Sequence, residues 1–326
     1  MFEIALAKLD KDEEAEEGML MLRGVIHESD RILRSRFENV DEEAEAPPEP
    51  LPSTFHWTYG SALFRLGLLI LEDEENDDAE SEALQYIEAA IDRYDTGLEQ
   101  DGADKDWKLN EAMARAVVEK ANLTLRQDPT YPLKKIDALI ATAFKHISLA
   151  LSILASNDHD ESVAVLLILI RHAQLREDTD GAKKWLNTAR VELNKLLKVD
   201  PTHTATLQTL AQTYMSAAND LLDAAEQSGA AETDLAAVGK LVDEALKYLH
   251  RAENKSGSAA DVKLQLLLGE VYVNKANLLD EEDDETKANE FYKKAVECFQ
   301  RVQGVDAKAL PEEFDSFLKE WEADLE

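Results

Sequence analysis

The sequence contains a single cysteine, Cys298, among its 326 residues. One cysteine cannot form a disulfide within the chain, and disulfide frameworks are typical of secreted proteins. The N-terminus, MFEIALAKLDKDEEAEE, also lacks the basic and then apolar order of a signal peptide. We therefore expect a protein of a reducing compartment, in which Cys298 is an inert thiol of the core.

Glycine (12) and proline (8) are scarce, which disfavours a turn-rich sheet protein and favours long helices. Long apolar runs are missing as well. The longest run of large apolar residues, from Val163 to Ile170 with Ala164 inside it, is far shorter than the ~20 residues that span a bilayer. We interpret that run as a buried helix segment and expect no membrane association.

Basic residues are few, since 35 lysines and arginines face 68 aspartates and glutamates, for a net charge of −33. Such a field repels nucleic acid and anionic membranes and speeds encounters with basic proteins. The charge therefore predicts no direct nucleic-acid binding and favours a basic protein partner. The alternative, that the acidity only keeps the protein soluble, remains open at this point.

Sequence patterns of catalysis or cofactor binding are also absent. No glycine-rich phosphate loop occurs, and no two of the seven histidines lie three or four positions apart on one expected helix. His159-Asp160-Glu161 resembles an acid–base cluster, but we interpret it as the turn that begins a helix. We predict no catalytic, cofactor-binding or metal-binding residues, and no cofactor.

The N-terminal part of the chain predicts an amphipathic helix at about residues 17–38. Its apolar stripe consists of Leu22, Val25, Ile26, Ser29, Ile32 and Leu33. The segment DEEAEAPPEPLPS at 41–53 combines acids with four prolines and predicts a solvated linker. The expected organisation is an N-terminal helical segment (1–40), an acidic proline-rich linker (41–53) and a helical-repeat domain (54–326).

A repeated spacing of small and large residues follows the linker. In tetratricopeptide repeats, the second helix has a small residue, a large one four positions later and a small one three after that, so that the paired helix approaches closely. Five segments fit this pattern: Ala83/Ile87/Ala90, Ala143/Ile147/Ala150, Ala182/Leu186/Ala189, Ala245/Leu249/Ala252 and Ala288/Tyr292/Ala295.

The segments before these anchors fit the first helix of such repeats. Pro201 is followed by Leu210, Ala211 and Tyr214 at the offsets of the repeat pattern, and the same pattern recurs in Tyr59/Gly60/Leu63 and Leu268/Gly269/Tyr272. The five anchors are unevenly spaced, whereas a regular array steps by about 34 residues. The extra length includes two acidic inserts, 72–82 and 280–285, which we expect to project into solvent.

The last segment predicts a capping helix at about residues 311–324. Pro311 lies in its first turn, and one face is apolar: Phe314, Phe317, Leu318 and Trp321. A stack of repeats needs such a cap. The predicted fold is all-α: an irregular tetratricopeptide-like helical-repeat superhelix of about five helix pairs, with an N-terminal helix and a C-terminal capping helix.

The first helices of stacked pairs line the concave side, where repeat proteins bind their ligands. Positions beside the large anchor residues of those helices are therefore candidates for a protein-binding groove: Trp57, Arg65, Gln208, Gln212, Met215, Ser216, Glu270 and Asn274. The groove around the last two repeats is the favoured contact surface, because it mixes amides, a methionine and an acid on an expected rigid scaffold.

Three stretches resemble the fungal translation-termination enhancers, a family whose fission-yeast member is a negative regulator of an oxygenase. They are GVIHESDRILR (24–34), FHWTYGSALFRLGLLI (55–70) and the closing FYKKAVECFQRV with FDSFLKEWEADLE. Their order and spacing match the family from about residue 5 to residue 326. Family members begin with a lysine-rich segment that resembles a nuclear localisation signal, whereas this sequence begins Met1-Phe2-Glu3.

The resemblance implies a non-enzymatic, tetratricopeptide-like adaptor of nucleus and cytoplasm. It implies binding to a prolyl-hydroxylase-type 2-oxoglutarate oxygenase that acts on a basic small-subunit ribosomal protein. It further implies nuclear import, with an importin as a third partner, and an effect on the fidelity of translation termination.

Two alternatives remain open beside the adaptor. A general acidic chaperone would bind many basic proteins, ribosomal proteins among them, through salt-sensitive contacts. An unrecognised helical enzyme would need a deep pocket with converging titratable groups.

Overall fold

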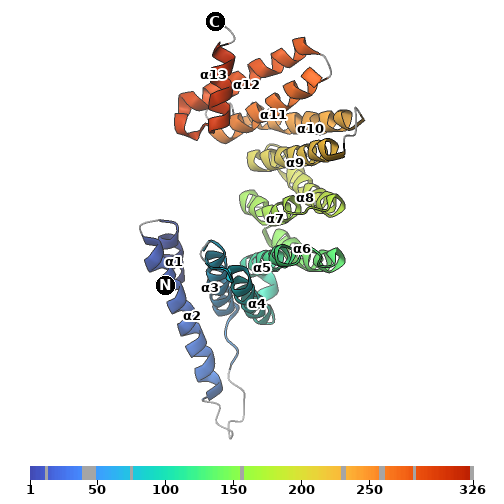
Figure 1. The fold of residues 1–326 in the computed structure, drawn as a ribbon. Helices are drawn as coiled ribbons and strands as arrows, with labels where there is room; N and C mark the ends of the chain where they lie inside the picture. The colour runs from blue at the N-terminus through green and yellow to red at the C-terminus, as the bar shows by residue number, and fades with distance from the viewer. Residues whose placement is uncertain are drawn as a thin grey trace. The chain divides into compact units, whose positions relative to one another are not determined.

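The computed structural model of the protein describes residues 1–11, 14–38, 49–73, 76–154, 158–228, 233–256, 261–281 and 284–323. These ranges contain thirteen α-helices and no strand, so the all-α prediction is confirmed (Figure 1). Parts of the predicted linker and acidic inserts, at 41–48, 74–75 and 282–283, lie outside the described residues.

Two compact units divide the chain. The first comprises residues 1–158 with 167–172, and the second comprises residues 159–166 with 173–326. The boundary passes through α7 (His159–Gln174). The predicted buried run, Val163 to Ile170, lies in this helix, and its buried residues are Val163, Val165, Leu166, Ile168, Leu169 and Ile170.

An N-terminal helical hairpin opens the first unit. The predicted helix is present as α2 (Ala15–Glu38), and a short preceding helix that was not predicted, α1 (Phe2–Leu9), packs against it. A Cβ atom on Gly18 would lie 2.9 Å from the Leu9 backbone nitrogen, so the close approach requires glycine there. The hairpin packs on α3 (Ser53–Leu71) through buried Phe2, Ala5, Leu22, Val25, Ala62 and Leu66.

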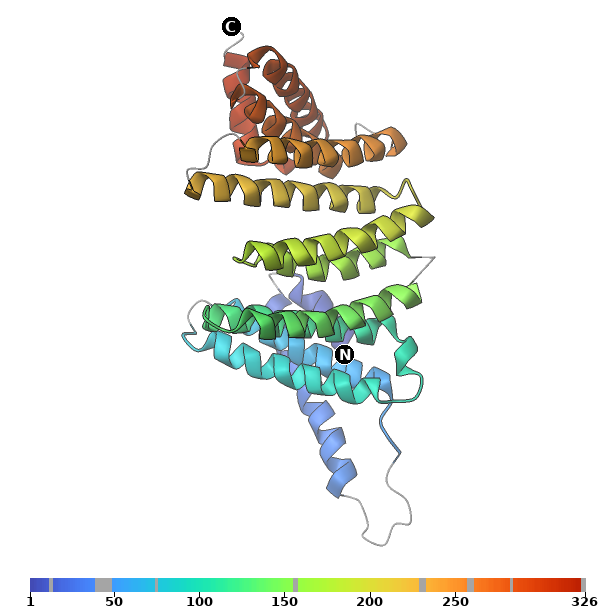
Figure 2. The same cartoon turned by 90° about the vertical axis from the view of Figure 1, so that its right-hand side faces the viewer.

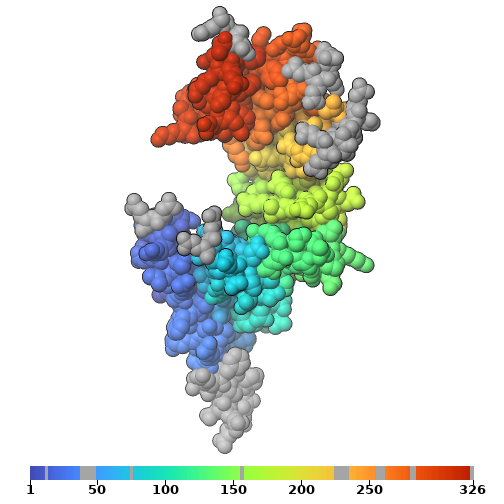
Figure 3. Space-filling view, in the orientation of Figure 1, coloured from blue at the N-terminus to red at the C-terminus, as the bar shows by residue number. Residues whose placement is uncertain are grey.

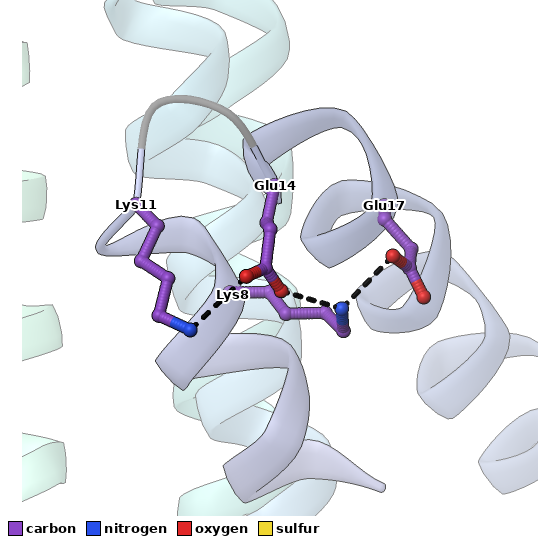
Figure 4. A network of polar contacts seen from close by, with 4 residues as sticks. All are labelled: Lys8, Lys11, Glu14 and Glu17. Carbon is purple, nitrogen blue, oxygen red and sulfur yellow. Dashed lines mark hydrogen bonds and ion pairs between the residues drawn. The ribbon is translucent and has the colours of Figure 1, made fainter.

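Ion pairs orient the turn between these two helices. The Lys8 Nζ atom lies 2.6 Å from Glu14 Oε2 and 2.9 Å from Glu17 Oε2, and Lys11 Nζ lies 3.0 Å from Glu14 Oε1. Figure 4 shows these four side chains and the contacts between them. The side chains of Lys11 and Glu17 are exposed, so we expect these pairs to add little stability. The apolar contacts with α3 are the main source of stability for the hairpin.

Two helix pairs follow in the first unit: α3 with α4 (Ala79–Leu98), and α5 (Trp107–Gln127) with α6 (Leu133–Leu154). A Cβ atom on Gly60 of α3 would lie 2.6 Å from a ring carbon of Tyr94 on α4. The glycine of the repeat pattern therefore makes room for an aromatic ring of the partner helix.

Buried histidine–asparagine pairs connect α5 to the helices that follow it. The His146 Nδ1 atom of α6 lies 3.0 Å from Asn110 Oδ1, and the His172 Nδ1 atom of α7 lies 2.7 Å from Asn122 Oδ1. Burial lowers the pKa of His146, which favours its neutral form. Hydrogen bonds of this kind satisfy polar groups that would otherwise be costly to bury.

Within the second unit, each helix from α8 to α13 contacts the next helix in chain order (Figure 2). A Cβ atom on Gly269 of α11 would overlap the ring of Phe299 on α12, as at the glycine of α3. The helices of this unit are α8 (Thr179–Val199), α9 (Thr204–Ser228), α10 (Thr233–Ser256), α11 (Val262–Glu281), α12 (Glu285–Val305) and α13 (Glu312–Ala323).

The five predicted anchor triplets lie on α4, α6, α8, α10 and α12, the second helix of each pair. All of their members are buried except Tyr292, which is half-buried. Among the described residues, the helices from α3 to α12 follow one another as five consecutive pairs, as the repeat pattern predicts.

The C-terminal cap is confirmed as α13, which begins and ends within one residue of the predicted bounds. The rings of Phe314 on α13 and Phe299 on α12 stack with centroids 4.4 Å apart, and Phe317 and Trp321 contact Tyr292. Figure 3 shows α13 in direct contact with the neighbouring helices of its unit. Aromatic contacts of this type cover the apolar end of the stack.

One helix among the described residues, α6, is long and apolar enough to cross a bilayer by length and composition. Its most apolar window has a mean hydropathy of 1.5, and 28% of that window is buried. A single helix of this kind is weak evidence for membrane insertion, because helices of soluble cores reach the same hydropathy.

We expect the substitution Ala252→Leu to destabilise the protein by roughly 1–3 kcal/mol, because extra methylenes must fit a fully packed helix contact. The exposed Ala141→Leu change on α6 is the matched control and should leave stability within about 0.5 kcal/mol. Urea unfolding followed by circular dichroism measures both. Equal midpoints for the two variants would show that Ala252 is not an anchor.

Candidate protein-binding site

The eight candidate residues lie on first helices of the pairs, in two groups. Trp57 and Arg65 lie on α3 of the first unit. The other six lie on α9 and α11 of the second unit, and these two helices contact each other: Gln208, Gln212, Met215, Ser216, Glu270 and Asn274. The structure thus brings six of the candidates onto adjoining helices of one compact unit.

A hydrogen bond connects the two helices of the second group. The buried Gln208 donates its Nε2–H to Asp261 Oδ2 at 3.3 Å, and Asp261 Oδ1 accepts the backbone N–H of Leu264 at 3.0 Å in the first turn of α11. Gln208 therefore positions α11 against α9. Met215 is buried too. Gln208 and Met215 therefore pack under the exposed residues of this surface.

The remaining candidates of this group are half-exposed: Gln212, Ser216, Glu270 and Asn274. Asn274 donates its Nδ2–H to the backbone carbonyl of Glu270 at 3.1 Å. The carboxylate of Glu270 has no ion-pair partner among the residues that the structure describes. Its binding role stays a prediction, but its side chain is accessible to a partner.

The electrostatic environment of Glu270 is unfavourable for its negative charge. Burial raises the pKa of this carboxyl, and the charge of Glu313 on α13 raises it further. A cation bound beside the carboxylate of Glu270 would offset this unfavourable environment. The arrangement is suited to a lysine or arginine side chain supplied by another protein.

The α3 group consists of a tryptophan in contact with an aromatic ring and an arginine with a buried nitrogen atom. Trp57 packs edge-on against Phe2, with ring centroids 5.7 Å apart, and the Lys108 Nζ atom lies 6.0 Å from its ring centroid. The Nε atom of Arg65 is buried and has no hydrogen-bond partner within the described ranges. Both side chains are half-exposed, and partner binding by them also stays a prediction.

Several residues that shape the second group were not predicted. Glu313 lies more than forty positions from Glu270 in the sequence, so no local pattern connects them. The Arg190 guanidinium of α8 lies 4.3 Å from the Tyr214 ring centroid and donates an Nε–H bond to Thr213 Oγ1 at 3.1 Å. This cluster fixes α8 against α9, and only the contact between the two helices reveals it.

Metal binding and acid–base catalysis find little support in the described part of the chain. No group of three or more histidine, cysteine, aspartate or glutamate residues there is arranged to hold a metal ion. His159 and Asp160 lie in the first turn of α7, as predicted for a helix start. They contact His203, whose Nε2 atom lies 3.3 Å from Asp160 Oδ1.

Comparison with known families matches residues 5–137 to the family described as nuclear pore complex subunit Nro1. The chain is 32% identical over 137 residues to the Schizosaccharomyces pombe protein named negative regulator of ofd1. It is 24% identical over 375 residues to enhancer of translation termination 1 of Saccharomyces cerevisiae, an alignment that covers 95% of this chain and 84% of the relative. The family match covers less than half of this chain.

The alignments to other relatives are shorter. Enhancer of translation termination 1 of Scheffersomyces stipitis is 36% identical over 98 residues, and the chain covers 21% of that protein and 32% of the S. pombe relative. These names describe regulatory roles of the relatives.

The fold is shared with a solved structure. The structure of the S. pombe nuclear import adaptor Nro1 superposes with a TM-score of 0.58 at 20% sequence identity, covering 98% of this chain and 94% of that one. At this identity the similarity establishes the helical-repeat fold, which agrees with the five pairs and the cap.

Cys298 should be chemically inert in the folded protein. Its side chain is buried on α12, and burial raises the pKa of its thiol to about 12, so the reactive thiolate is scarce at neutral pH. We expect negligible maleimide labelling of the native protein at pH 7.5 and complete labelling in denaturant. Rapid labelling of the native protein would contradict the core position.

The substitution Glu270→Gln should stabilise the isolated protein at pH 7. A carboxyl whose pKa is raised by folding destabilises the native state while ionised, and this cost disappears as the pH falls through the folded pKa. The variant should therefore melt at a higher temperature than the parent at pH 7, and the difference should vanish at lower pH. The exposed Glu290→Gln change on α12 serves as the control and should leave the melting temperature unchanged.

Proposed function

We propose that the chain is a non-enzymatic adaptor that binds other proteins. The S. pombe relative is named for negative regulation of ofd1, and a solved relative is named a nuclear import adaptor. A set of helix pairs with accessible side chains on adjoining first helices suits this role. We propose a location in nucleus and cytoplasm, in keeping with the description of the matched family as a nuclear pore complex subunit.

The proposed partners are a prolyl-hydroxylase-type 2-oxoglutarate oxygenase and its basic small-subunit ribosomal-protein substrate. An importin is a third proposed partner, since the solved relative is named an import adaptor. A role in the fidelity of translation termination is proposed from the names of the S. cerevisiae and S. stipitis relatives.

One observation supports a basic partner most directly. Burial and the negative charge of Glu313 raise the pKa of Glu270, and Glu270 is half-buried without an ion pair in the described ranges. The net charge of −33 attracts a basic protein over a long range. At Glu270, a cation is also needed locally to compensate the carboxylate. A lysine or arginine of the partner would meet both conditions.

A general acidic chaperone for basic ribosomal proteins is the second candidate, because the net charge alone would attract many such ligands. The two functions differ in their salt dependence. A specific adaptor with apolar contacts should retain affinity for one partner at high salt, whereas a chaperone held by charge alone should lose all of its ligands.

The test of the α9–α11 surface is a double substitution, Gln212→Lys with Glu270→Lys, which introduces positive charge at both positions. We expect weaker binding of the basic ribosomal protein by roughly 1–3 kcal/mol, because the added positive charge repels the partner where contacts are lost. The matched control, Gln303→Lys with Glu290→Lys on exposed positions of α12, changes the net charge equally. Isothermal titration calorimetry with the purified partner measures all three proteins.

Equal losses in the test and control variants would show that net charge, and not this surface, determines affinity. Normal binding by the test variant, combined with loss of binding after deletion of residues 72–82, would move the site to the acidic insert.

A further inference from the structure

The outer face of α6 differs in chemistry from the rest of this acidic protein. The inner face of the helix packs against α5 through buried Ile136, Ile140, Ala143, Ile147, Ala150 and Leu154. On the remaining surface, Leu149 is 45% exposed and Ile153 is 36% exposed. These two residues are four positions apart, so they are neighbours on one side of the helix.

Small side chains surround this apolar pair. The exposed residues of the same face are Ala138, Ala141, Thr142, Ser148 and Ser152, none of which extends far from the helix. Leu133, which is 42% exposed, lies at the N-terminal end of α6. A partner helix could approach the α6 backbone closely along this stretch.

The charges of α6 have the opposite sign to the chain as a whole. Its exposed charged residues are Lys134, Lys135 and Lys145, and its one acid, Asp137, is half-buried. The surrounding segment, 133–199, contains ten lysines and arginines against eight acids, so the net charge of −33 arises outside it. The exposed charged residues of α6 itself would therefore not repel an acidic protein.

We propose that the outer face of α6 is a docking surface for a partner segment that has apolar residues flanked by acids. Leu149 and Ile153 supply the apolar contact, and Lys145 pairs with the flanking acids of the partner. A second copy of this chain fits less well, because two molecules of net charge −33 repel each other. An anionic membrane is disfavoured for the same reason.

This surface is independent of the α9–α11 site. The α6 surface lies in the first unit and attracts an acidic partner, whereas the α9–α11 site attracts a basic one. A failure of one proposal therefore leaves the other untouched. An adaptor with two such surfaces could hold a basic and an acidic protein together.

Two synthetic helical peptides test the proposal with the full chain. Both have the same leucine stripe, and the flanking positions are glutamate in one and lysine in the other. We expect the glutamate peptide to bind at least about ten-fold more tightly in fluorescence anisotropy, although the net charge of the protein favours the reverse order.

The variant Lys145→Glu with Leu149→Glu should weaken binding of the glutamate peptide by about ten-fold or more, because it removes the apolar contact and reverses the charge. The matched control, Lys263→Glu with Val305→Glu, alters an exposed lysine and an exposed valine of the second unit and should retain the affinity. Circular dichroism of both variants verifies that the fold is intact.

Tighter binding of the lysine peptide, or equal losses in the two variants, would overturn the proposal. Phosphatidylserine vesicles that bind the parent and not the α6 variant would overturn it in favour of a membrane contact. Sedimentation equilibrium that shows a dimer of the parent and a monomer of the α6 variant would overturn it in favour of self-association.

Discussion

The close approach of two helices within each pair is the constraint on which the remaining structure depends. Alanines of the second helices are buried without exception in the five anchor triplets, and Gly60 and Gly269 of first helices face the rings of Tyr94 and Phe299. Small residues on one helix let large residues of the other fill the space between them. Each pair then presents a defined surface to the next, which is the requirement for a stack.

Polar contacts between the helices select one orientation of this packing. The pairs His146–Asn110 and His172–Asn122 connect α5 to α6 and α7, and Gln208–Asp261 connects α9 to the start of α11. A buried hydrogen bond contributes modest net stability but is costly to lose, so it selects one arrangement among several that are equally apolar. The helices that present the candidate side chains are positioned by such bonds.

The charge of the chain is unevenly distributed, and this has functional consequences. Glu270 is a half-buried carboxylate whose pKa is raised by burial and by the charge of Glu313, which suits a basic partner. The outer face of α6 exposes lysines beside Leu149 and Ile153, which suits an acidic one. Net charge governs how fast partners meet, whereas these local arrangements govern which partner remains bound.

The sequence by itself determined the helical class, the five pairs and the cap, because the spacing of alanines, glycines and aromatic residues reports directly on helix packing. It did not predict α1, whose eight residues are too few for a clear periodic pattern. It proposed Gln208 and Met215 as groove residues, and their burial could be seen only in the structure because neighbouring helices cover them. The electrostatic effect of Glu313 on Glu270 and the exposure of Leu149 were decided by tertiary structure alone. Both depend on which helices pack together and not on the order of residues within one helix.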